Sequence, residues 1–400
     1  MATTLSQSSS AEGSSGQAAS IEAFVREARR TVGQKANDVP EGIGVADWLS
    51  IERIMNGTGD ENPLFRDPNY GASSAHYTML APPSFIFAVR TPTSVATLYE
   101  RDYGRPLPLL TAVDAEWDDH IRLGDRLSSD LRVGRVQQGA DWRGRSTAEV
   151  TSEATYTKGG MNRPFARATG VTTIYPITRG GGDRFVEREL YQYSDEEIAA
   201  IERDLAAEPA PRGNRTRYWN DVKEGDQLPT LVKGPLSLSD LMAWAVAEAK
   251  PMKLGGLVYK EILANPGRRT VNPSTNWSYW DAEQEAEDIQ SCQDAGFPGP
   301  YGRGAMRAAL AIQALTHWMG DDAFLRRISV QLPKPFIYGD VMRVSGEVAD
   351  KFTQQIDGRT YNAVEVTVRG VNQLDETVLS AQAVVYLADR GMPVALPIAE

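Results

Sequence analysis

The sequence predicts an α+β chain that contains one unit twice, a helix followed by an antiparallel sheet. Two long apolar stretches, 84–101 and 305–320, are each long enough for a buried helix, and alternating apolar and polar segments follow each of them. The sheet-forming region of each half also has a Gly-Asp turn after its first strand, in IRLGDRL at 121–127 and in FIYGDVM at 336–342. An internal duplication explains all of these observations.

The composition limits the class of protein. Of the 400 residues, 41% are hydrophobic and 24% are charged, which is ordinary for a globular chain of two or three domains. The net charge of −11 argues against a nucleic-acid partner, because the chain has no basic field to neutralise phosphates. The one cysteine, Cys292, excludes an intrachain disulfide framework, and with three histidines it leaves little material for a metal site. We expect no metal and no redox cofactor.

We expect a cytoplasmic protein with two repeats joined by a linker. Residues 1–20 are rich in Ser and Gly and lack the basic start and apolar core of a signal peptide, so they are expected to be a disordered leader. No stretch approaches the roughly 18–20 apolar residues of a membrane helix, so no membrane contact is expected. Residues 21–177 are assigned to the first repeat, 178–215 to a linker with one surface helix, and 216–400 to the second repeat.

The spacing of apolar residues predicts the elements of each repeat. Residues 21–35 and 45–57 have a helical period, and 194–208 is a charged helix with a Ser cap. In the stretch 84–101, Pro92 is expected to kink or split the helix. Apolar and polar residues that alternate between Gly-rich and Asp-containing turns predict the strands. The strand-forming segments are 109–137, 145–160 and 164–177 in the first half and 324–352, 359–373 and 376–388 in the second.

Several motifs resemble those of the MaoC-like, R-specific enoyl-CoA hydratases. GDENPLFRDPNYG at 59–71 is similar to the family signature, which reads roughly G-D-x-N-P-[LIV]-H-x-D-x-x-Y/F-A. APPSF at 81–85 and GFPGPYGRGAMRAAL at 296–310 resemble the turns that enter the long helix in the two-repeat members. The resemblance covers about 45–175 and 215–390. It implies a double hotdog fold, in which two curled sheets each wrap a helix and pair edge to edge.

The sequence departs from this signature at one position that matters for catalysis. The family's catalytic pair is the Asp of the G-D-x-N-P motif and a His five residues later. Asp60 matches the first, but Phe65 stands where the His is expected. In the second half the segment matched to the signature is NWSYWDAE at 276–283, which places Tyr279 near the His position. Neither signature site keeps its His.

Asp60 is the predicted general base, because hydration of a 2-enoyl thioester requires a group that takes a proton from water. Asn62 would orient it. The alternative is that Asp60 and Asn62 only cap a turn before Pro63. His76, in the loop before the apolar stretch, is the candidate replacement for the missing imidazole, and its alternative role is that of a surface loop residue.

The remaining residues of these motifs have alternatives that the sequence leaves open. We expect Asp67 and Tyr70 to fix the loop rather than to touch substrate. His120 lies in a strand among charged residues and His317 at the end of a helix beside Trp318, and both are expected to be structural.

The resemblance also implies a site for the thioester oxygen. The family holds this oxygen with a backbone N–H at the start of the long helix, where the helix dipole adds positive potential. Gly304 fits this position in the second half. In the first half Pro83 occupies it and has no N–H, although Ser84 does.

Three further residues are candidates for binding the rest of the substrate. Arg303 would meet the phosphates of CoA, with a solvated helix face as the alternative. Tyr279 and Tyr301 carry hydroxyl groups in polar loops and would line the acyl pocket, unless they belong to the core.

The sequence therefore predicts an acyl-CoA hydratase or dehydratase in which CoA is part of the substrate. The loss of both signature histidines leaves a non-catalytic acyl-thioester binding protein, or one subunit of a complex, as a second reading. A thioesterase on the same fold is a third. A homodimer of the fused pair also remains open, and neither the acyl chain nor the pathway follows from the sequence.

Overall fold

The computed structural model describes most of the chain. It covers residues 19–36, 38, 41–160, 163–180, 184–250, 255–265, 267, 271, 276, 286, 288–390 and 393–398. Of the predicted leader, only residues 19 and 20 lie within this part, and they begin a helix that runs to residue 28. Tyr279 and most of the segment 276–283 lie outside it.

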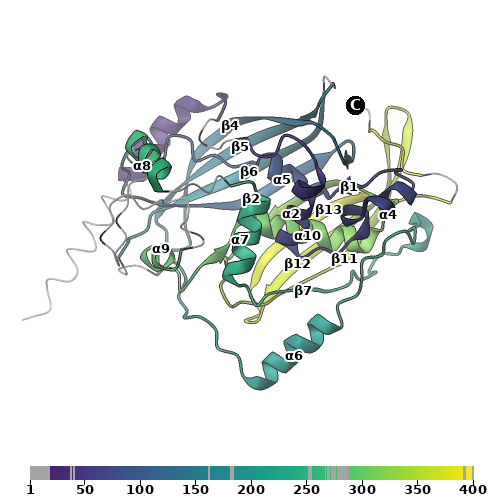
Figure 1. The fold of residues 1–400 in the computed structure, drawn as a ribbon. Coiled ribbons are helices and arrows are strands. Elements are labelled where there is room, and N and C mark those ends of the chain that lie inside the picture. The colour runs from purple at the N-terminus through teal and green to yellow at the C-terminus, as the bar shows by residue number, and fades with distance from the viewer. Residues whose placement is uncertain are drawn as a thin grey trace, which may run out of the picture.

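An antiparallel sheet of nine strands runs through the described molecule (Figure 1). Its strand order is β4-β5-β6-β2-β9-β13-β12-β11-β7. The strands are β2 (Leu107–Trp117), β4 (Leu127–Ala140), β5 (Ser146–Lys158), β6 (Pro164–Tyr175), β7 (Leu231–Lys233), β9 (Phe324–Gln331), β11 (Met342–Ile356), β12 (Arg359–Asn372) and β13 (Thr377–Tyr386).

The strand order itself reveals the duplication. The four strands of the first repeat, β4-β5-β6-β2, are followed by β9-β13-β12-β11, which is the same series of the second repeat in reverse. The two series join where β2 pairs with β9, with Asp114 opposite Ser329. A pseudo-twofold axis therefore passes through this pairing. The predicted double hotdog architecture is confirmed, and β7 adds a short edge strand beside β11.

Helices cover one face of this sheet (Figure 1). α10 is buried from Ala305 to Met319, because it is apolar on nearly every side and other elements surround it. α10 packs closely on β2, since a Cβ atom at Gly304 would lie 2.7 Å from the carbonyl oxygen of Leu110. The helices are α2 (Trp48–Thr58), α3 (Pro63–Arg66), α4 (Pro68–Ser73), α5 (Ile86–Val89), α6 (Asp195–Ala206), α7 (Leu238–Ala247), α8 (Gly255–Ala264), α9 (Ile289–Asp294) and α10 (Gly304–Met319), with short 3-10 turns η1 (Arg29–Thr31), η2 (Pro83–Phe85) and η3 (Trp219–Asp221).

Two small ladders repeat the same local design in both halves. β1 (Leu80–Ala81) pairs with β3 (Ile121–Arg122), and β8 (Tyr301–Gly302) pairs with β10 (Phe336–Ile337). Each second strand ends in a predicted Gly-Asp turn whose carboxylate accepts the N–H three residues earlier. The Asp125 carboxylate accepts from Arg122 at 2.9 Å, and that of Asp340 from Ile337 at 3.0 Å.

The long helix predicted for 84–101 is wrong. The chain is helical only from Pro83 to Val89, as η2 followed by α5, and Arg90 is already extended with φ −170 and ψ 119. Pro92 cannot donate the N–H that a continuing helix needs. The buried guanidinium of Arg90 also donates to the carbonyl of Ala36 at 2.7 Å, which holds the chain in its new direction. Pro92 therefore ends the helix instead of kinking it.

Caps explain why several other helices form as predicted. α6 begins at Ser194, whose hydroxyl accepts from the N–H of Glu197 while the Glu197 carboxylate accepts from the N–H of Ser194. Ser237 and Asp240 form the same reciprocal box at the start of α7. α6 lies at the periphery of the molecule in Figure 1, on the linker between the repeats, and its Ile201 packs against Val232 and Val341 of the second repeat.

Candidate functional site

The loop that carries the signature begins at a left-handed glycine. Gly59 follows α2 with φ +62, a backbone conformation that favours glycine. The N–H of the next residue, Asp60, donates to the carbonyl of Met55 at 2.8 Å and closes the helix end. These bonds fix where the Asp60 side chain leaves the backbone.

The Asp60 carboxylate is buried and contacts the second repeat. The residue is 2% exposed. Its Oδ1 accepts a hydrogen bond from the backbone N–H of Asn62 at 2.9 Å and pairs with Nε2 of His317 at 2.8 Å. The other oxygen, Oδ2, has no hydrogen-bond partner among the described residues. One oxygen is thus held from two sides, and the other is left to act on a ligand.

The rest of the loop consists of successive caps. Oδ1 of Asn62 accepts from the N–H of Leu64 at 3.1 Å and starts α3, and Oδ1 of Asp67 accepts from Asn69 at 2.8 Å and starts α4. Asp60 and Asn62 therefore do cap turns, as the alternative interpretation held. In Asp60 this cap coexists with the contact to His317, so a catalytic role for the two residues remains a prediction.

His317 is the site residue that sequence reasoning missed. It lies in the last turn of α10, is 5% exposed, and its buried Nδ1 has no partner among the described residues. One turn earlier, Nε2 of Gln313 donates to the carbonyl of Gly59 at 3.2 Å, while its buried Oε1 also has no partner in that part of the chain. The signal that points to this face is a pair of polar side chains four residues apart in an otherwise apolar stretch of helix.

The residue in the signature His position has a different environment. Phe65 is buried at 4% exposure in the main hydrophobic core. Its side chain therefore contributes to packing, and the imidazole next to Asp60 comes from the other repeat.

We predict that Phe65→His does not increase hydration activity. His317 already pairs with Oδ1 of Asp60, and a buried imidazole in the place of Phe65 finds no polar partner in the apolar core. The substitution is expected to lower the free energy of unfolding by about 1–3 kcal/mol. Denaturant titration and an enoyl-thioester assay check both parts, with Phe65→Leu as the apolar control. Higher turnover in the His variant would contradict this account.

His76, the predicted replacement for the missing imidazole, belongs to another cluster. Its Nε2 donates to the backbone carbonyl of Asp321 at 2.8 Å, and its ring lies edge-on to that of His120 at 4.7 Å between centroids. The hydroxyl of Tyr70 donates to Oδ2 of the same Asp321 at 2.7 Å. Tyr70 thus ties the loop to the second repeat, whereas the structure brings His317, and not His76, into contact with Asp60.

The His120 ring makes stability sensitive to acid. Burial, and then the neighbouring His76, lower the pKa of His120 from 6.5 to about 3. Between pH 6.5 and pH 3 the unfolded chain therefore binds a proton that the folded chain does not, and stability falls as the pH falls. We predict that His120→Gln has a melting temperature that depends less on pH over this range. An equal dependence in variant and wild type would contradict the assignment.

A cavity of about 470 Å³ adjoins the Asp60–His317 pair. A volume of this size is typical of small-molecule sites. Its polar side includes Thr58, Glu61, Lys233 and His317. The linker lines another side through Glu208, whose Oε2 accepts from the N–H of Val232 at 2.7 Å. Apolar residues on α10, on β10 and around β7 and α6 complete the walls: Leu205, Val232, Leu236, Met306, Leu310 and Phe336.

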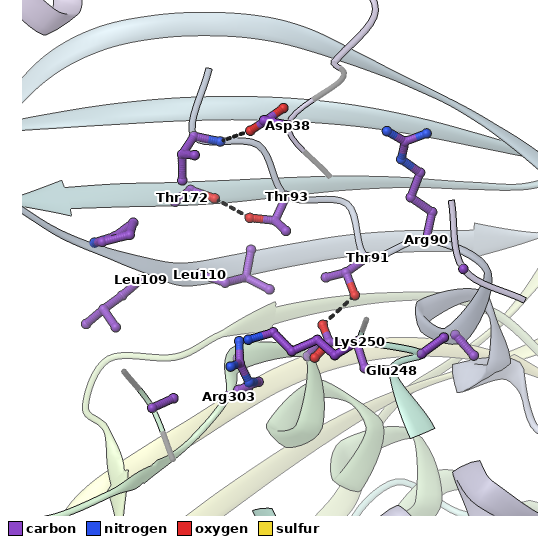
Figure 2. A pocket seen from close by; sticks show the side chains of 18 of the residues that line it. Asp38, Arg90, Thr91, Thr93, Leu109, Leu110, Thr172, Glu248, Lys250 and Arg303 are labelled. Atoms are coloured by element: carbon purple, nitrogen blue, oxygen red, sulfur yellow. Dashed lines mark hydrogen bonds between the residues drawn. The ribbon is translucent and has the colours of Figure 1, made fainter. Parts of the chain in front are cut away.

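The predicted substrate residues fall at two ends of α10. Pro83 and Ser84 form η2, which contacts both α2 and α10. Tyr301, Arg303 and Gly304 instead line a second cavity of about 230 Å³ at the start of α10 (Figure 2). Gly304 and His317 are 13 positions apart on this helix, which is about 20 Å at 1.5 Å per residue. The two groups therefore serve different sites.

The second cavity is the counterpart of the first in the other repeat. After α7, Ala249 takes the left-handed conformation with φ +54, and the N–H of Lys250 donates to the carbonyl of Ala245 at 3.0 Å. This is the same arrangement that Gly59 and Asp60 form after α2. Lys250 therefore occupies the place after α7 that Asp60 occupies after α2. The predicted match of the signature to 276–283 lies almost wholly outside the described residues.

Lys250 lies in the second cavity near a different polar pair. Figure 2 shows Thr91 donating to Oε1 of Glu248, at 2.6 Å, with Lys250 on the same side of the cavity. The second site thus has the start of α10 and a cavity. At the position that corresponds to Asp60 in the first site, it has the ammonium group of Lys250 instead of a carboxylate. Among the described residues, a carboxylate at this place after the helix occurs only in the first repeat.

Comparisons with known proteins agree with this architecture. Residues 31–160 match a family model described as a FAS1-like dehydratase domain region. A solved MaoC-like dehydratase aligns with a TM-score of 0.59 and 18% identity, over 90% of this chain and 100% of that one. The resemblance to MaoC-like dehydratases is confirmed. A putative MaoC domain dehydratase from Chloroflexus aurantiacus aligns with a TM-score of 0.53 and 13% identity, over 90% of this chain and 95% of that one.

A conserved hypothetical protein of Mycobacterium tuberculosis with a double hotdog fold aligns with a TM-score of 0.48 and 14% identity, over 88% of this chain and 96% of that one. No curated protein matches the sequence. In the described part of the chain, no helix is long and apolar enough to span a membrane. The same residues contain no group of three or more His, Cys, Asp or Glu side chains placed to hold a metal ion.

Proposed function

We propose that this chain catalyses the reversible addition of water to a 2-enoyl thioester, with CoA as part of the substrate. The observation that carries the proposal is the buried hydrogen bond between Asp60 and His317, 2.8 Å long, beside a cavity that His317 lines. Carboxylate and imidazole side chains are the groups that most often act as general acids and bases on a substrate.

The two residues have different roles in the proton transfer. Asp60 uses its unbonded Oδ2 to take a proton from water while the water oxygen forms a bond to C3 of the thioester. The electron pair of the C2=C3 bond moves toward the thioester carbonyl, and C2 then receives the proton that Oδ2 took from the water. His317 donates through Nε2 to Oδ1 and so orients the carboxylate for both proton transfers. The cycle adds one water and returns both side chains to their starting states.

The shape of the cavity supports an acyl thioester as substrate. Met306 and Leu310 lie along the same helix as His317 and offer an apolar wall for an acyl chain. The polar groups Glu61, Lys233 and His317 gather at the end where α2 stops, which is where the thioester has to react. The linker between the repeats lines this cavity through Leu205 and Glu208, so it is part of the proposed site.

The proposal is tested with a panel of straight and branched 2-enoyl-CoA thioesters of increasing length. Loss of the enoyl absorbance on mixing with the protein is the expected result. Release of free thiol without that loss would identify a thioesterase. A rise in melting temperature with no chemical change would identify a binding protein. Either of the last two outcomes overturns the proposal.

A further inference from the structure

Hydration of a thioester also requires a donor for the carbonyl oxygen, which gains negative charge as the C2=C3 electrons move toward it. Neither backbone position predicted for this task lines the cavity beside Asp60. Gly304 lies about 20 Å from His317 along α10. Pro83 has no N–H, and it opens a single 3-10 turn followed by the four residues of α5, too short a helix for a strong dipole.

We infer that Lys233 is the catalytic donor that receives the thioester oxygen, an inference that rests on the proposed hydration reaction. Lys233 ends the edge strand β7, opposite Met342 of β11. It lines the same cavity as His317, and it is the only Lys or Arg among the described residues that do so.

The ammonium group of Lys233 has N–H groups that make no hydrogen bond within the described part of the chain. Its one hydrogen bond among the described residues goes to the carbonyl of Thr58 at 3.3 Å, and no carboxylate of that part of the chain lies within ion-pair distance. Two of its three N–H groups are therefore available. Burial lowers the pKa of Lys233, while the charges of Glu208, Asp60 and Glu61 act in the opposite direction. A poorly hydrated cation near these carboxylates is well suited to stabilise a transient oxyanion.

The competing role for Lys233 is structural. Thr58 is the last residue of α2, and a lysine near a helix C-terminus stabilises it by binding the final carbonyl groups. This role affects folding but not the polarisation of a bound thioester carbonyl. A test must therefore measure an effect of Lys233 on that carbonyl.

The kinetic test compares Lys233→Met with wild type on a 2-enoyl-CoA. Because the bond to the oxygen strengthens only in the transition state, kcat is expected to fall about 10²–10³-fold with little change in KM. Lys233→Arg keeps a cation and is expected to recover part of the loss. Lys223→Met, at an exposed lysine outside the cavity, is the matched control. A rise in KM at unchanged kcat would overturn the inference, because it would place Lys233 in substrate binding alone.

The second test needs no turnover and so separates the inference from the proposed function. 3-Phenylpropenoyl-CoA is bound to Asp60→Asn, which lacks the base, and its absorbance spectrum is recorded. Polarisation of the carbonyl by Lys233 is expected to shift the enoyl band to longer wavelength, and the shift disappears in Asp60→Asn/Lys233→Met. No shift in the protein that keeps Lys233, or the same shift without it, overturns the inference. Failure of every enoyl thioester to react, with the shift present, would overturn the proposed function alone.

Discussion

Asp60→Asn is expected to lower the turnover of a 2-enoyl thioester by about 10²–10⁴-fold, the usual contribution of a general base. The amide of Asn still offers an oxygen to the N–H of Asn62 and so preserves the turn. It has no carboxylate oxygen to take a proton from water in the place of Oδ2. The loss should therefore fall on kcat, with the melting temperature close to that of wild type.

The matched control for this prediction is Asp67→Asn in the same loop. Asp67 has the same kind of cap, since its Oδ1 accepts from the N–H of Asn69, but it does not contact His317. Its Asn variant should keep both fold and turnover. Wild-type turnover in Asp60→Asn would remove Asp60 from the mechanism, whatever the control shows. Equal losses in both variants would indicate that the loop is only structural.

The fold was predictable because its signals are local. Alternation marks the strands, and caps such as Ser237 with Asp240 mark helix starts. The pairs of Gly-Asp turns exposed the duplication before any strand order was known. The helix over 84–101 failed because the chain does not resume a helix after Pro92. The Arg90 side chain, bonded to Ala36, 54 positions away in the sequence, holds the chain in its new direction, and reading along the chain does not show this contact.

Of the Asp60–His317 pair, only Asp60 was predictable, because a tertiary contact again decides where the other residue lies. Asp60 lies in a motif that is contiguous in the sequence, so reading along the chain finds it. His317 lies 257 positions away, and only the packing of α10 against the loop after α2 brings the two together. The same packing explains why Gly304 and Arg303 belong to a separate cavity. A buried polar pair on an apolar helix, Gln313 and His317, was the one available sign.

His317→Gln is expected to lower turnover by about 10²–10⁴-fold, while His76→Gln leaves it close to wild type. Glutamine has an N–H near the position of Nε2, so it can still donate to Oδ1 of Asp60, but its flexible amide does not hold the carboxylate in the orientation that the imidazole ring imposes. His76 serves as the control because it contacts the backbone of Asp321 and not Asp60. Initial rates, with circular dichroism spectra to confirm folding, measure both.

The combination with Asp60→Asn shows whether His317 works through Asp60. Residues that act as one unit lose their function when either is removed, so the double variant should be about as slow as the slower single variant. If the two losses instead multiply, His317 acts on the substrate independently of the carboxylate. Full activity in His317→Gln would mean that the contact between the repeats only supports the fold, and the missing signature histidine at Phe65 would then have no replacement in this pair.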